Sequence, residues 1–218
     1  RGGARVRSYM DPTVKYHAKY LVADAGPAII ATANLTHKCL TRTFDALVVT
    51  HDAAVVDGLH ELMAADLAGR ALPASLPSRL IVGPECARRQ VESLIDAARF
   101  RIRLIDAKLS DVDIQARLEL RRRAGVQVEI LDSHWIGDLK SHGKVMLIDD
   151  RVAVVGSLAL APSSLDRRRE LAITVDNPAA VADLGRVFDS AARLETGIVP
   201  TSPIPPQLVR AADRYATC

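Results

Sequence analysis

Two separate stretches of this chain, residues 15–24 and 140–149, begin with charged or ionisable residues at every second position and continue with four apolar residues. Alternation with a period of two is typical of a half-buried β-strand, so each stretch predicts one. Both stretches read His-x-Lys-x4-Asp. Because the His and the Lys are two positions apart, a strand would place both on one face. The residues concerned are His17, Lys19 and Asp24 in the first stretch, and His142, Lys144 and Asp149 in the second.

The similarity continues well beyond these two strands. An ungapped superposition pairs Lys15 with Lys140, Thr32 with Ser157, Leu35 with Leu160, Leu40 with Leu165 and Asp45 with Glu170. Apolar positions at helical spacing follow in both copies. The chain therefore carries a strand-hairpin-strand-helix unit twice. Two copies are too few for a solenoid, so we predict a pseudo-symmetric pair of units that form a single site where they meet.

The hydrophobic pattern also predicts the elements of each copy. In the first copy we expect strands at 14–23, 28–33 and 46–50, a polar loop at 34–44, and a helix at 53–67. In the second we expect strands at 80–82, 101–105 and 126–131, helices at 87–99, 113–124 and 181–194, and a hairpin turn at 149–151. Alternating strands and helices predict an α/β fold with parallel or mixed sheets flanked by helices.

The boundaries follow from this pattern. Residues 1–72 form the C-terminal part of a first unit, 73–79 a linker with two prolines, 80–196 a second unit, and 197–218 a Pro-rich tail. A long α/β stretch precedes the second motif, but the first motif begins almost at once. The first unit is therefore predicted to be truncated. We expect a missing N-terminal half or a second chain to complete it.

Composition narrows these expectations only a little. The 218 residues are 49% hydrophobic and 25% charged, with a net charge of +3, which is typical of a globular protein. The runs Arg121–Arg123 and Arg167–Arg169 either favour an anionic substrate or are solvated faces. No apolar run is long enough to span a bilayer. A cytoplasmic location is the default expectation, with association to a membrane surface left open.

Residue spacing does not indicate a metal site, and no cofactor is expected. The cysteines are widely separated, which favours free thiols over disulfides or a zinc site; they are Cys39, Cys86 and Cys218. Four further histidines show no paired ligand spacing: His37, His51, His60 and His134. Trp135 precedes the second motif and either lines a substrate pocket or belongs to the core.

The repeated residues match the needs of phosphoryl chemistry. A histidine that attacks phosphorus needs a cation for the phosphate oxygens, a partner that fixes its tautomer, and a second acid for the leaving oxygen. Lys19 and Lys144 are the candidate cations. The candidate donors are Thr32, Asn34 and Ser157. Asp45 and Glu170 follow the two histidines at equal distances, as expected of carboxylates that orient an imidazole.

This set resembles the phospholipase D superfamily, and in particular bacterial phospholipase D-like and cardiolipin synthase-like phosphodiesterases. Members carry paired His-x-Lys-x4-Asp motifs, each followed by Gly-Ser-x-Asn and an acidic residue. The resemblance implies metal-independent chemistry through a covalent phosphohistidine. By analogy it makes His17 the nucleophile and His142 the general acid, although these roles are interchangeable. It also implies that Asp24 and Asp149 support the motif's structure rather than the chemistry.

The sequence departs from the family pattern at three places. Ala31-Thr32 replaces Gly-Ser in the first copy, Asp45 is the shorter acid, and Ala159 stands at the Asn position of the second copy. Both His-Lys pairs are intact. The resemblance therefore implies a hydrolase or transferase acting on phosphodiesters, with a phospholipid head group as the leading substrate. The alternatives are a nuclease of the same superfamily and a non-catalytic binding module.

Overall fold

A computed structural model describes residues 6–9, 11, 13–131 and 135–195 of the chain. They form a mixed α/β fold whose largest sheet has six strands in the order β6-β14-β12-β11-β7-β8. These strands are β6 (Leu80–Val82), β7 (Arg101–Ile105), β8 (Gln127–Leu131), β11 (Val145–Ile148), β12 (Val152–Gly156) and β14 (Leu171–Val175). Only the β7-β8 pair is parallel. All six strands lie within residues 80–196, the predicted second unit.

The first copy has a smaller sheet of three antiparallel strands in the order β2-β3-β5. The strands are β2 (Tyr20–Val22), β3 (Ala28–Ala31) and β5 (Leu47–Thr50). In the ungapped superposition they correspond to β11, β12 and β14, which are adjacent in the large sheet in the same order. The predicted repeat is thus also a structural repeat.

Two small sheets join the copies reciprocally. Strand β1 (Lys15–Tyr16) pairs in parallel with β13 (Arg168–Arg169), and β10 (Leu139–Ser141) pairs in parallel with β4 (Thr43–Phe44). Strand β9 (Trp135–Ile136) extends the second pair. In each pair, a strand that precedes a motif histidine in one copy lies beside a strand of the other copy. This exchange relates the copies by a pseudo-twofold arrangement.

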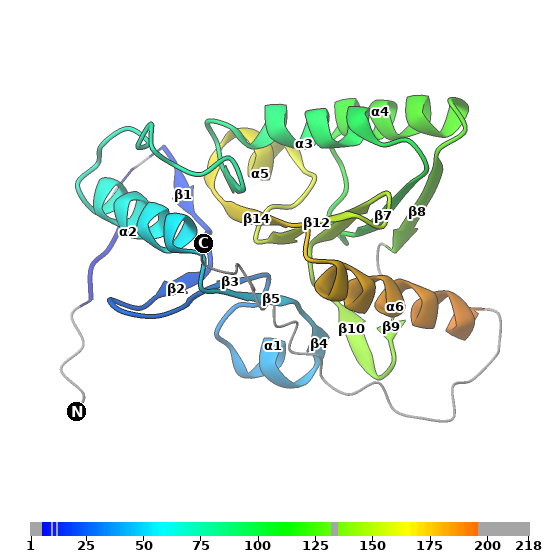
Figure 1. Cartoon of the computed structure of the whole chain (residues 1–218), viewed down its shortest axis with the longest axis horizontal. Coiled ribbons are helices and arrows are strands. Elements are labelled where there is room, and N and C mark those ends of the chain that lie inside the picture. The colour runs from blue at the N-terminus through cyan, green and yellow to red at the C-terminus, as the bar shows by residue number, and fades with distance from the viewer. Residues whose placement is uncertain (1–5, 10, 12, 132–134, 196–218) are drawn as a thin grey trace, which may run out of the picture.

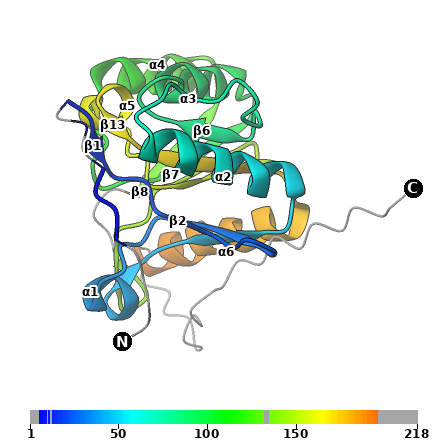
Figure 2. The ribbon, with the colours of Figure 1, turned by 90° about the vertical axis from the view of Figure 1, so that its left-hand side faces the viewer.

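Helices divide the molecule into layers around two hydrophobic cores. Figure 1 shows α3 (Ala87–Ala97) and α4 (Val112–Arg123) along one side of the large sheet, with α2 (Ala53–Leu67) and α6 (Pro178–Glu195) on its other side. One core is formed by α2, α6 and both main sheets, and the other by α3, α4 and the outer face of the large sheet. In the turned view of Figure 2, α2 lies between the large sheet and β2. The copies therefore share one core.

The two predicted motif strands are interrupted. Residues 17–19 and 142–144 are in no strand, because at each point the chain leaves a small sheet and enters a main one. The expectation of continuous strands there was wrong. The predicted loop at 34–44 also contains α1 (His37–Thr41) and β4. Helix α2 has the predicted bounds, and the other helices differ by one to three residues at an end.

The remaining expectations concern exposure and position. Trp135 is largely exposed, so a place in the core is excluded. His134 and the Pro-rich tail lie outside the described residues. None of the helices in the described part of the chain is long and apolar enough to cross a membrane.

Candidate functional site

The two motif histidines occupy equivalent positions, each directly after a short strand. The backbone of each is hydrogen-bonded to the other copy. The backbone N–H of His17 donates to the carbonyl of Arg169 at 2.8 Å, and that of His142 donates to the carbonyl of Phe44 at 3.3 Å. Both contacts continue the parallel pairing of β1 with β13 and of β10 with β4. The joining sheets therefore fix the backbone positions from which both imidazole side chains extend.

The first imidazole contacts a buried carboxylate. Nδ1 of His17 lies 2.9 Å from Oε2 of Glu170. The Ser157 hydroxyl donates to the same oxygen at 2.5 Å, and the Ser164 hydroxyl donates to Oε1 at 2.7 Å. Glu170 is fully buried, whereas the His17 side chain is 23% exposed. The carboxylate is thus fixed from behind, and the ring is accessible to a ligand.

The second imidazole repeats this arrangement. Nδ1 of His142 lies 2.8 Å from Oδ1 of Asp45. The Thr32 hydroxyl donates to Oδ1 at 2.7 Å, and the Thr43 hydroxyl donates to Oδ2 at 2.7 Å. Asp45 is buried at its carboxylate, and the His142 side chain is 30% exposed. Thr32 and Ser157 occupy equivalent positions in the repeat, and both hold a carboxylate.

Each histidine is paired with the acidic residue of the other copy. Glu170 belongs to the copy of His142 but contacts His17, and Asp45 belongs to the copy of His17 but contacts His142. The sequence showed both acids at equal distances after their own histidines and gave no sign of this exchange. The exchange of acids results from the pairing of β4 with β10 and of β13 with β1. These strand pairs join one copy to the other, so no pattern within either copy's sequence reveals them.

Both carboxylates are held in the ionised form. Burial alone would raise the pKa of Glu170, but hydrogen bonds from His17, Ser157 and Ser164 outweigh it and lower the pKa. Burial opposes hydrogen bonds in the same way at Asp45, whose pKa is also lowered. An ionised carboxylate only accepts hydrogen bonds, so each Nδ1 carries the proton. Nε2 of a neutral ring is then the free nitrogen.

The two motif lysines are partly buried beside these rings. Lys19 Nζ donates to the carbonyl of His17 at 2.7 Å, and Lys144 Nζ donates to the carbonyl of His142 at 2.9 Å. Burial lowers the pKa of Lys19 to about 8, and the charges of Lys144 and Lys108 contribute to this, while Glu170 opposes it. The pKa of Lys144 is also lowered, mainly by burial. Each motif lysine thus feels the charges of both copies.

Mutually repelling ammonium groups favour an anionic ligand. Lys108, in the loop before α4, adds to the positive charge of both motif lysines. Its contribution was not found from the sequence, because Lys108 belongs to no repeat or motif. The arrangement can hold an anion beside two imidazoles whose Nδ1 atoms each face a carboxylate.

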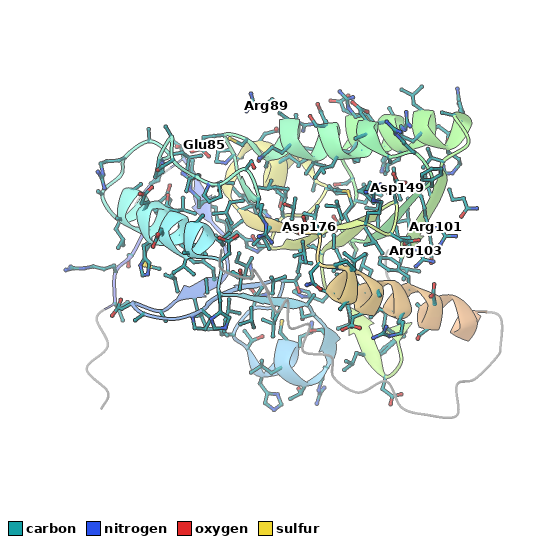
Figure 3. All side chains as sticks on the ribbon, viewed as in Figure 1. Glu85, Arg89, Arg101, Arg103, Asp149 and Asp176 are labelled. Carbon is teal, nitrogen blue, oxygen red and sulfur yellow. The ribbon has the colours of Figure 1, made fainter. Side chains whose placement is uncertain are left out.

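The motif aspartates lie away from this centre. Asp149 accepts hydrogen bonds from the backbone N–H groups of Arg99, Phe100 and Arg101 at 2.7–3.2 Å. Figure 3 shows it near Arg101. Asp24, its counterpart, is exposed. Asn34 contacts the Cys39 sulfur at 3.9 Å, and no hydrogen bond joins it to a motif histidine among the residues described.

Comparison with protein families matches about half of the chain. Residues 90–192 match the family model described as "Cardiolipin synthase, PLD-like domain". This segment is similar to a phospholipase D-like domain. The matched segment contains the second motif, and the first motif lies before it. No protein with a curated description matches the chain.

Solved structures resemble up to 82% of the chain. Polyphosphate kinase from Porphyromonas gingivalis has a TM-score of 0.67 at 19% identity, over 82% of this chain and 33% of that one. Phosphatidylserine synthase from Haemophilus influenzae has a TM-score of 0.61 at 12% identity, over 80% of this chain and 61% of that one. A phospholipase D family member, Nuc from Salmonella typhimurium, matches 52% of this chain and 92% of that one at 20% identity and a TM-score of 0.48.

These likenesses concern the fold. The chain spans about a third of the length of the polyphosphate kinase and less than two thirds of that of the synthase. The phospholipase D-like fold and the mixed sheets flanked by helices were correctly predicted from the sequence.

Proposed function

We propose that this chain cleaves or transfers phosphodiesters through a covalent phosphohistidine formed between its two copies. The supporting observation is the exchanged pair of contacts, His17 with Glu170 and His142 with Asp45. Two oriented imidazoles beside two lysines provide the nucleophile, the acid and the oxyanion contacts of one displacement.

In the first step, Nε2 of His17 attacks phosphorus. Glu170 accepts from Nδ1 and stabilises the positive charge that develops on the ring. Lys19 and Lys144 contact the non-bridging oxygens. His142, as an imidazolium stabilised by Asp45, donates its Nε2 proton to the leaving oxygen as the P–O bond breaks.

In the second step, His142 is neutral and acts as the base. It takes a proton from water or from an acceptor alcohol, whose oxygen attacks phosphorus and breaks the P–N bond to His17. Both imidazoles then return to their starting protonation states. The geometry is nearly symmetric, so the assignment of His17 as nucleophile rests on the family analogy.

We propose a phospholipid head group as the substrate. The matching family model and one similar structure carry the names of cardiolipin synthase and phosphatidylserine synthase, which are enzymes that make phospholipids. A nuclease is the competing possibility. Mixed micelles containing phosphatidylglycerol and a single-stranded oligonucleotide, assayed side by side with a chelator present, distinguish the two.

An activated substrate separates the two histidines. Bis(p-nitrophenyl) phosphate has a leaving group that needs no acid, so His142→Ala should release about one nitrophenolate per chain and then stop, because the second step lacks its base. His17→Ala should release none. Peptide mapping of the stopped protein should place the phosphoryl group on His17.

The opposite pattern would show that the two roles are exchanged. A folded wild-type chain with no turnover on any of these substrates would contradict the proposed activity and favour the non-catalytic alternative. Loss of wild-type activity on adding the chelator would contradict metal-independent chemistry.

A further inference from the structure

One end of the proposed site contains a thiol that the other end lacks. Cys39 lies on α1, whose chain leads directly into β4 and Asp45. Ligand atoms of Cys39, Asp45 and His142 all lie within 4.8 Å of one another. Residue spacing did not indicate this group, because its members come from three different segments.

The backbone holds the three residues in place. The pairing of Thr43 with Lys140 and of Phe44 with Ser141 brings Asp45 and His142 together. The Thr43 hydroxyl contacts the carbonyl of Cys39 at 3.4 Å, which ties α1 to the same strand. The group therefore forms part of the folded backbone arrangement and does not depend on flexible surface side chains.

The chemistry of these donors fits a soft or borderline divalent cation. Thiolate, imidazole and carboxylate are the ligands of zinc, with a tetrahedral arrangement and a fourth position for water. Ligand atoms around zinc lie about 3.3–3.7 Å apart. Binding therefore separates His142 Nδ1 from Asp45 Oδ1, which are 2.8 Å apart, and draws together any ligand atoms that are up to 4.8 Å apart. Asp45 and Cys39 are buried, and the partly exposed His142 gives access from solvent.

The equivalent group at the other end has a serine hydroxyl in place of the thiol and Glu170 in place of Asp45. Cys39 corresponds to Ser164, whose hydroxyl donates to Glu170 beside His17. A serine hydroxyl is a poor zinc ligand compared with a thiolate. The first end of the site is thus an internal control for zinc binding, because its equivalent positions carry an imidazole, a carboxylate and a hydroxyl instead of a thiol.

We propose that Cys39, Asp45 and His142 bind a thiophilic divalent cation such as Zn²⁺, which switches off the proposed phosphodiester chemistry. On binding, the thiol proton and the Nδ1 proton of the His142 imidazolium pass to solvent, and Nδ1 coordinates the metal while Nε2 keeps its proton. Asp45 changes from hydrogen-bond acceptor to metal ligand. His142 can then no longer form the imidazolium that protonates the leaving oxygen. The inhibition rests on the proposed function, whereas metal binding does not.

Zinc binding is measured first, without substrate, by competition with a fluorescent chelating indicator. We expect one Zn²⁺ per wild-type chain. Cys39→Ser, which installs the residue of the other end, should weaken binding at least about 30-fold. The matched controls Cys86→Ser and Cys218→Ser should bind like wild type. Ser164→Cys should add a second zinc equivalent.

A second readout does not depend on how well a variant folds. Saturating Zn²⁺ should slow the alkylation of Cys39 in the wild-type chain. Peptide mapping measures how much of Cys39 is alkylated. In an active chain, Zn²⁺ should inhibit turnover and a chelator should restore it, and Cys39→Ser should resist inhibition. Equal zinc affinity in Cys39→Ser, unprotected Cys39, or no bound zinc would overturn the site.

The two proposals fail separately. A chain that cleaves phosphodiesters but binds no zinc contradicts only the metal site. A chain that binds zinc through Cys39 but cleaves no phosphodiester contradicts the proposed function and the switch, and the binding site stands.

Discussion

In the second copy of the repeat, α3 and α4 cover the outer face of a six-stranded sheet, whereas the first copy has three strands and no such layer among the described residues. Equivalent leucines show the difference directly. Leu40 is 70% exposed and its counterpart Leu165 is fully buried, and Leu35 is 82% exposed where Leu160 is 6% exposed. The same sequence pattern thus gives a core in one copy and an open apolar face in the other.

The difference leaves the centre of the molecule unaffected. Each histidine has its carboxylate at 2.8–2.9 Å whether or not its own copy is covered. The joining sheets and the shared core of α2 and α6 hold the site. The site geometry therefore requires the pairing of the copies rather than the completeness of each.

We propose that the chain folds as two units, residues 1–72 and 80–196, joined by a linker at 73–79. Both units contribute strands to the two joining sheets.

The largest expected difference between the copies concerns their leucines. Leu165→Ala should lower the free energy of unfolding by about 3 kcal/mol, because it leaves a cavity in the core beneath α3. Leu40→Ala should change it by less than about 0.5 kcal/mol, because that side chain is already in water. Urea unfolding of both variants measures this, and equal losses would show that the face of the first copy is buried in solution.

The motif aspartates should differ by a smaller amount. Asp149→Ala should cost about 2 kcal/mol, because three backbone N–H groups at the start of β7 lose a charged acceptor. Asp24→Ala should have little effect, since the first copy has no strand equivalent to β7 among the described residues. The comparison uses thermal unfolding of both proteins. A large loss of stability in Asp24→Ala would contradict this difference, because it would show that the Asp24 carboxylate also has a stabilising partner.

These contrasts also show what the sequence alone revealed. The repeat and the helix at 53–67 followed from periodicity and spacing, which are local signals. The candidate site residues were chosen from the same signals, and their roles stay a prediction. The breaks at 17–19 and 142–144 did not follow from these signals, because strands of two residues have no period. Nor did the exchange of Asp45 and Glu170, because pairing between copies is a tertiary property. Equivalent sequence positions suggested symmetry but gave no indication of which copy supplies each partner.

The smallest expected effect is a shift with pH. Because burial lowers the pKa of Lys19 to about 8, its ammonium is present below that pH and is lost as the pH rises through it. The value of kcat/KM should therefore fall about tenfold per pH unit above about pH 8. Lys19→Arg keeps its charge in this range and should move the fall to higher pH. An unchanged profile in Lys19→Arg would assign the titration to another group.

The exchange of carboxylates is tested most directly in the His142→Ala background, where the nitrophenolate burst reports His17 alone. With chelator present, we expect Glu170→Gln to slow the burst about 100-fold, because the His17 ring loses the acceptor that orients it. Asp45→Asn should leave the burst rate unchanged, because His142, the histidine that Asp45 contacts, is already absent. A burst slowed by Asp45→Asn and not by Glu170→Gln would contradict the pairing between copies.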